Sequence, residues 1–126
     1  MKNILVKSTG KSPFVSFDAE TGILEIAGRA IPEDSAAFFE PLSAWLDEYL
    51  LSPAPKTVLT FKMYYFNTST SKWILNLLKK FNNVLDKNID FEVLWFWEDE
   101  DSLEYGQEVG ELLNFPITFV ETELDL

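Results

Sequence analysis

Residues 57–85 change their hydrophobic pattern part-way along, and this change constrains the fold more than any other feature of the chain. The stretch opens with β-branched and aromatic residues from Val58 to Phe66, a pattern typical of a buried strand. It closes with apolar residues at the spacing of one helical face: Ile74, Leu77, Leu78, Phe81, Val84 and Leu85. The pattern predicts a strand over residues 57–66 and a helix from about residue 70 to residue 87.

The junction between these two elements is a run of polar side chains: Asn67, Thr68, Ser69, Thr70 and Ser71. Such residues are the preferred caps of a helix start, which is the common explanation of the run. Free N–H groups and the helix dipole also attract anions at such a place. The functional alternative is phosphorylation, which adds about −1.5 to −2 charges at the helix start. On the residues alone, the run can be a cap, a phosphate-accepting site or both.

The rest of the chain alternates between strand and helix patterns. Strands are predicted at residues 4–6, 14–17, 23–26, 91–97 and 117–120. One helix is predicted to begin near residue 35 or a turn later and to end near residue 50, and another spans residues 102–113. The segments 14–17 and 23–26 form a predicted hairpin. This order predicts one α/β domain over residues 1–126, whose mixed sheet is antiparallel at the hairpin and parallel later, with about three helices.

Four expectations concern the limits and burial of these elements. Gly22 can adopt a positive φ in the hairpin, and residues 28–32 are expected to leave the sheet. Pro41 fits best in the first turn of its helix, where its missing N–H costs nothing. The strand at 91–97 lacks polar alternation after its second residue, so we expect it to be central and buried on both faces.

An acidic run, Glu98 to Asp101, precedes the third predicted helix. Ser102 is the expected cap of this helix, which Gly106 and Gly110 weaken by about 1 kcal/mol each relative to Ala. Oxygen ligands in a loop can hold Mg²⁺ or Ca²⁺, but the spacing does not match a calcium-binding loop. We therefore expect a solvated loop without a tightly bound metal.

Loops at the carboxyl ends of strands are where α/β proteins bind their ligands. The loops that follow Phe66 and Trp97 both leave such ends, so they are expected to lie on one rim. Trp73 stands off the apolar stripe of its helix, where an exposed Trp is a plausible binding anchor. The residues predicted to bind a partner are Asn67, Ser71, Lys72, Trp73, Glu98 and Asp99.

Composition excludes several classes of function. The chain has no Cys and no His, which removes thiol chemistry and the commonest general base. The segment around Ser71 and Lys72 lacks the glycines of a phosphate-binding nucleotide loop. Ten Lys and Arg against 21 Asp and Glu give a net charge of −11, which disfavours nucleic acid and anionic membranes as partners. No signal peptide or membrane-spanning stretch is visible, so we expect a cytoplasmic protein.

Several segments resemble the SiaC family of bacterial regulatory phosphoproteins. They are residues 28–33 (GRAIPE), 39–49 (FEPLSAWLDEY), 66–72 (FNTSTSK) and 95–101 (WFWEDED) continuing to Gly106. Together they span most of the chain, and the Asn-Thr-Ser-x-Ser-Lys segment is the most specific of them. Thr70 stands where Ser is more usual in the family, which is a mild departure.

The resemblance implies a fold like that of STAS-domain anti-sigma-factor antagonists and a protein that is a switch, not an enzyme, with no cofactor. It implies a partner kinase, a PP2C-type phosphatase and phosphorylation on Thr68, with Ser69, Thr70 and Ser71 as alternates. It further implies that the unphosphorylated form binds and stimulates an effector, a diguanylate cyclase in the best-understood case. Thr68 is then expected to be accessible at the strand-to-helix connection. The alternatives left open are a module that binds a divalent metal or small ligand, and a small hydrolase.

Overall fold

Six strands form one sheet in the order in which they occur along the chain, in a computed structural model that describes residues 1–123. The elements are β1 (Ile4–Val6), β2 (Phe14–Phe17), β3 (Ile23–Ala30), α1 (Ser35–Tyr49), β4 (Thr57–Phe66), α2 (Thr68–Asn82), a 3-10 turn (Leu85–Lys87), β5 (Phe91–Trp97), α3 (Glu100–Glu111) and β6 (Thr118–Glu121). Strands β1 to β3 pair antiparallel, and β3 to β6 pair parallel. The predicted mixed α/β fold with an antiparallel start and three helices is confirmed.

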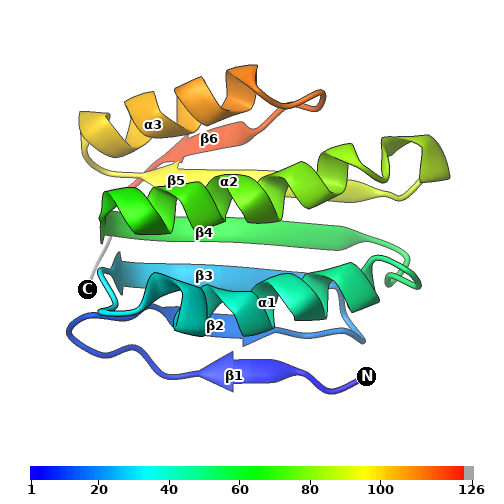
Figure 1. The fold of residues 1–126 in the computed structure, drawn as a ribbon. Helices are drawn as coiled ribbons and strands as arrows, with labels where there is room; N and C mark the ends of the chain where they lie inside the picture. Colours follow the sequence, from blue (N-terminus) through cyan, green and yellow to red (C-terminus); the bar gives the residue numbers. More distant parts are fainter. Residues whose placement is uncertain (124–126) are drawn as a thin grey trace.

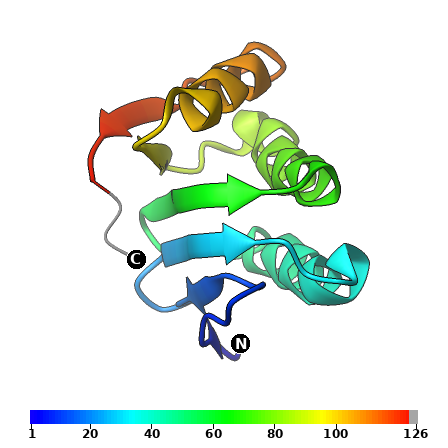
Figure 2. The same cartoon turned by 90° about the vertical axis from the view of Figure 1, so that its left-hand side faces the viewer.

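All three helices lie on one face of the sheet (Figures 1 and 2). Side chains alternate between the two faces of a strand, so every second residue of the inner strands points at the helices. The fully buried side chains on the two sides of this interface include Phe17, Leu24, Ile26, Phe61 and Trp95 from the sheet and Phe39, Leu46, Ile74, Leu77 and Phe81 from the helices. None of the helices within residues 1–123 has the length and apolar character needed to cross a membrane.

The opposite face of the sheet carries no helix, and this corrects the expectation that β5 is buried on both faces. Val93 and Trp95 are buried, whereas Leu94 and Phe96 on the open face are only half-buried. The continuous apolar run arises because the open face is itself partly apolar and is shielded by long side chains. Lys62 lies 5.2 Å from the ring centre of Phe96 and pairs with Glu25 at 3.0 Å.

Strand β3 extends further than its hydrophobic pattern indicates. The sequence predicted that residues 28–32 leave the sheet, but the pairing with β4 continues to Ala30. It does so because the register shifts between Gly28 and Arg29, where Gly28 adopts a φ of +111°. In the hairpin, Gly22 has a φ of +75° as expected, and a side chain there would collide with the Lys56 carbonyl.

Acidic side chains cap α1 and α3, which gives α1 the earlier of its two predicted starts and α3 a start before the predicted one. Asp34 caps α1 at Ser35, so Pro41 lies in the second turn and not the first. Its missing N–H leaves the carbonyl of Ala37, an exposed residue, to water. Asp99, and not Ser102, caps α3.

The helix α2 begins and ends earlier than predicted. Asn67 accepts a hydrogen bond from the Thr70 N–H at 2.9 Å, so the helix starts at Thr68 rather than near residue 70. It ends at Asn82, and Val84 and Leu85 beyond it lie just before and at the start of a separate 3-10 turn. Short polar side chains cap helices through such bonds, which hydrophobic spacing does not reveal.

Candidate functional site

The starts of the three helices lie at one edge of the molecule, where the parallel strands β3, β4 and β5 end (Figure 1). Each start is capped in the same way, by a side-chain oxygen that accepts from the backbone N–H three residues further along the chain. The caps are Asp34, Asn67 and Asp99, at donor–acceptor distances of 3.0, 2.9 and 2.9 Å. The predicted rim, with the loops after β4 and β5 together, is therefore present.

Thr68 is the first residue of α2, and its side chain is exposed. Only Asn67 separates it from β4, and the Asn67 N–H donates to the Ala30 carbonyl at 3.3 Å. The backbone on both sides of Thr68 is thus fixed by the sheet and by the helix. This gives Thr68 a rigid position with an accessible hydroxyl.

The other three hydroxyls of the run are engaged in hydrogen bonds. Ser69 contacts the Ser35 hydroxyl at 2.6 Å and donates to the Asn67 side chain at 3.0 Å, which joins the starts of α1 and α2. Thr70 is fully buried and donates to the Ala30 carbonyl at 3.0 Å. Ser71 donates to the Thr68 carbonyl at 2.6 Å. Among residues 1–123, the Thr68 hydroxyl alone of the four has no such partner.

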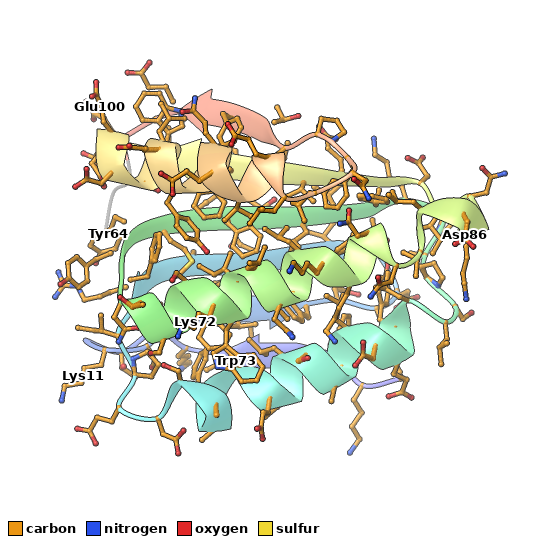
Figure 3. The ribbon with its side chains drawn as sticks, turned by 45° about the horizontal axis from the view of Figure 1, so that its top comes forward. Lys11, Tyr64, Lys72, Trp73, Asp86 and Glu100 are labelled. Atoms are coloured by element: carbon orange, nitrogen blue, oxygen red, sulfur yellow. The ribbon has the colours of Figure 1, made fainter. Side chains whose placement is uncertain are left out.

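The electrostatic surroundings of Thr68 are favourable for an anion. The first turn of α2 contains no acidic residue, so no carboxylate of its own neutralises the positive end of the helix. Lys72 is exposed and lies one turn further along, on the same side of the helix as Thr68. It forms no salt bridge within the described part of the chain. Figure 3 shows Lys72 near the start of α2.

The remaining predicted partner-binding residues occupy different environments. Trp73 is half-buried between α1 and α2, where its ring is stacked on Phe39 with centroids 6.2 Å apart. Asn67 and Ser71 are half-buried and hold the start of α2. Glu98 and Asp99 are exposed just after the end of β5. The rim thus presents Thr68, Lys72, Glu98 and Asp99 to solvent, while Trp73 mainly joins two helices.

A model of the family described as "SiaC family regulatory phosphoprotein" matches residues 6–122 of this chain. The chain belongs to the SiaC family. The expected resemblance is thereby confirmed over nearly the whole sequence.

Proteins of Pseudomonas aeruginosa are similar to this SiaC family member in sequence and in structure. An uncharacterised protein of strain UCBPP-PA14 is 23% identical over 118 residues, which cover 92% of this chain and 94% of that protein. The crystal structure of apo-SiaC matches with a TM-score of 0.88 at 22% identity, over 95% of this chain and 99% of that one. A structure of the diguanylate cyclase SiaD in complex with its activator SiaC matches with a TM-score of 0.88 at 21% identity, over 94% and 99% of the two chains. At this identity the structural likeness establishes the fold.

One residue of this SiaC family member that sequence reasoning missed is Tyr105 on α3. Its hydroxyl donates to the Ser71 carbonyl in the first turn of α2, and its ring packs on Phe66 and Trp95 with centroids 5.0 and 5.8 Å apart. Burial raises the pKa of Tyr105 to about 12, although its hydrogen bond to Ser71 lowers it and the charge of Glu108 adds to the rise. No local pattern predicts this contact, because it joins two residues that are 34 positions apart in sequence.

The acidic residues at the rim do not converge on a common centre. Within residues 1–123 there is no group of three or more His, Cys, Asp or Glu side chains arranged to hold a metal ion. Asp99 uses one carboxylate oxygen to cap α3, and Asp101 is exposed. The rim therefore offers hydroxyl, lysine and separate carboxylate groups for contact with another molecule.

Proposed function

We propose that this chain is a non-catalytic signalling switch in which phosphorylation of Thr68 controls the binding of an effector protein. A partner kinase adds the phosphate, and a metal-dependent phosphatase of the PP2C type removes it. The switch acts in the cytoplasm, where the kinase has ATP. The unphosphorylated form binds and regulates the effector, which we take to be a diguanylate cyclase, since SiaC is described as the activator of the cyclase SiaD.

The observation that carries this proposal is the state of the Thr68 hydroxyl. It is exposed at the first position of a capped helix, whereas the neighbouring hydroxyls bond to other groups in residues 1–123. A family of regulatory phosphoproteins needs one residue of this kind, accessible to an enzyme in the folded state. No observation in the described part of the chain favours the metal-binding or hydrolase alternatives over this one.

A phosphate on Thr68 would affect the fold and the effector differently. The N–H groups of the first turn and the helix dipole favour an anion there by roughly 0.3–1 kcal/mol, so the fold tolerates it. An effector packed on the same edge must instead desolvate the phosphate or place its own groups against about −1.5 to −2 added charges. A difference of about 1.4 kcal/mol already changes the affinity tenfold.

The deciding experiment compares three forms of the protein against one effector. The protein is isolated from its own cells, its phosphosite is mapped, and the cyclase that co-purifies with it is used as the effector. We expect unmodified protein and Thr68→Ala to bind with equal affinity, and the phosphoprotein to bind at least about tenfold more weakly. Thr118→Ala, an exposed threonine on β6, is the matched control and should still respond to the kinase.

Two results would remove Thr68 from the centre of this mechanism. One is equal effector affinity for the unmodified, phosphorylated and Thr68→Ala forms. The other is kinase labelling that persists undiminished in Thr68→Ala. In the second case Ser69 and Ser71 become the next acceptors to test, since Thr70 is fully buried.

A further inference from the structure

A cavity of about 320 Å³ lies on the same rim as Thr68, between the end of β4 and the start of α3. Aromatic and acidic side chains form its walls: Tyr64, Tyr65, Phe66, Tyr105, Asp99 and Asp101. Figure 3 labels Tyr64 and Glu100 at this end of the molecule, on the strand and the helix that border the cavity. Its volume is at the low end of the range of about 300–1,000 Å³ for ligand sites.

The charges of the cavity fit a positively charged occupant. Asp99 and Asp101 are both exposed carboxylates among its lining residues, which include no Lys or Arg. The nearest cation to these walls that a contact shows is Arg29, behind the lining and 5.5 Å from the ring centre of Tyr64, so the two carboxylates outnumber it. Asp99 accepts the Ser102 N–H with one oxygen at 2.9 Å, so its second oxygen remains for a ligand. Asp101 makes no side-chain hydrogen bond or salt bridge to residues 1–123.

The aromatic walls favour a flat organic cation over a metal ion. A guanidinium is attracted to the face of a tyrosine ring, as the contact of Arg29 with Tyr64 at 5.5 Å from the ring centre illustrates. Because Arg29 already lies against Tyr64, an incoming guanidinium would use the other aromatic walls, Tyr65, Phe66 and Tyr105. Mg²⁺ and Ca²⁺ need six or more oxygen ligands, and no three acidic groups converge on one point within residues 1–123. A guanidinium instead needs one or two carboxylates and an apolar surface for its planar faces.

We propose that this cavity receives an arginine side chain of a partner protein. Arginine is one of the residue types enriched among the anchors of protein interfaces. Its guanidinium pairs with carboxylates and stacks on aromatic faces, and the cavity offers both. This inference rests on the proposed function in one respect: the arginine is taken to belong to a partner protein. The binding of the side chain itself involves neither Thr68 nor a phosphate.

The cavity is connected to the Thr68 turn through two hydrogen bonds. Tyr105, one of its walls, donates to the Ser71 carbonyl, and the Ser71 hydroxyl donates to the Thr68 carbonyl. A partner that places an arginine in the cavity therefore contacts the wall that supports the start of α2. The anchor and the phosphorylation site would be covered by one interface.

The test begins with a model of the arginine side chain alone. N-acetyl-arginine amide is titrated into the full-length protein and followed by NMR, with N-acetyl-citrulline amide as the uncharged analogue of the same shape. We expect saturable shifts at the backbone amides around Tyr64, Ser102 and Tyr105 for the arginine compound, and at least about fivefold weaker binding for citrulline.

Two variants remove the charges while keeping the helix start. Asp99→Asn retains a good N-cap, so α3 should stay folded, and Asp101→Asn changes an exposed side chain. Each should weaken binding of the arginine compound at least about threefold, and the pair about tenfold. The matched control is Glu111→Gln, an exposed acid at the other end of α3, which should leave binding unchanged.

The effector provides the second half of the test, with the cyclase that co-purifies with the protein as the probe. The double variant should lose at least about tenfold in effector affinity, and Glu111→Gln should lose none. The inference is overturned by shifts that do not saturate, by equal binding of citrulline, by equal losses in Glu111→Gln, or by full effector affinity of the double variant. Thr68→Ala should bind the arginine compound with the affinity of the wild-type protein. The proposal of a phosphorylation switch and the proposal of an arginine-binding cavity can therefore be disproved independently.

Discussion

Tyr105 is the residue through which α3 supports the start of α2. Its hydroxyl donates to the Ser71 carbonyl, and burial is the main cause that raises its pKa to about 12. The pKa of a tyrosine in the unfolded chain is near 10.0. Between about pH 10 and about pH 12, Tyr105 is therefore mostly protonated in the folded protein and mostly ionised in the unfolded chain. The contribution of Tyr105 to stability is therefore complete below about pH 10 and is lost as the pH rises through about 12.

We predict that Tyr105→Phe removes this pH dependence. At neutral pH the variant should be about 1 kcal/mol less stable, because the Ser71 carbonyl loses its donor. From about pH 10 to about pH 12 the wild-type protein should lose about 1–2 kcal/mol that the variant does not lose, because solvent at the half-buried ring screens part of the effect of the raised pKa. The difference in stability should therefore shrink and then reverse. Urea unfolding at stepped pH measures this, with Tyr65→Phe at an exposed tyrosine as control. A difference that stays constant with pH would contradict it.

For single residues, the sequence predicted which side chains stand at the helix start better than it predicted their hydrogen-bond partners. The run of hydroxyls indicated a helix start, and Thr68 is accessible there as expected. Which hydroxyls are already engaged could not be predicted, because Ser35 and Ala30 reach Ser69 and Thr70 from elements more than thirty residues away. That Thr68 accepts the phosphate stays a prediction.

The packing of α3 on the sheet depends on how closely one turn of the helix approaches two strands. A Cβ at Gly106 would lie 2.8 Å from a ring carbon of Phe119 and 3.1 Å from the Trp95 indole. A Cβ at Gly110 would meet only the end of Ile117 at 3.9 Å, an ordinary contact. The two glycines thus have different roles, although both weaken the helix by the same amount on propensity alone.

Replacing each glycine by alanine should therefore shift stability in opposite directions. Gly110→Ala should stabilise the protein by up to about 1 kcal/mol through helix propensity. Gly106→Ala gains the same propensity but forces Phe119 and Trp95 apart, which costs about 1–3 kcal/mol, so the variant should be less stable than wild type. Chemical denaturation of the two variants measures both. Stabilisation of similar size in both would show that the close approach at Gly106 carries no cost.

The sequence predicted the type and order of the helices and strands well, but it predicted some of their first and last residues poorly. The bounds of β4 and β5 followed from continuous apolar runs, which is the strongest local signal available. The end of β3 was wrong because a register shift at Gly28 lets a strand continue through a glycine. The cavity beside Thr68 could not be predicted, because its walls come from β4 and α3 and meet only in the fold.

The whole molecule carries a net charge of −11, and no Lys or Arg follows residue 87. Self-repulsion of this excess opposes the compact state, while the surface salt bridges favour it. Residues 1–123 form four salt bridges, all with at least one well-exposed partner, and each contributes about 1 kcal/mol or less. Repulsion among the acidic residues should thus outweigh the attraction of the pairs.

We therefore predict that added salt stabilises the protein. Raising NaCl from about 0.01 M to about 0.5 M screens the excess charge, and the melting temperature should rise by a few degrees. The double variant Glu104→Gln, Glu111→Gln, at two exposed acids of α3, should respond less than wild type. A melting temperature that falls with salt would mean that the salt bridges dominate instead.

The single residue between β4 and α2 leaves no slack in the backbone before Thr68. An enzyme that modifies Thr68 in the folded protein cannot draw the segment out as an extended peptide. It must bring its active site to the end of a helix and fit the neighbouring helix starts at the same time. The selectivity of such an enzyme would then depend on the shape of the folded surface around Thr68. Other proteins of the cell with the same short sequence motif in an extended segment would not be modified.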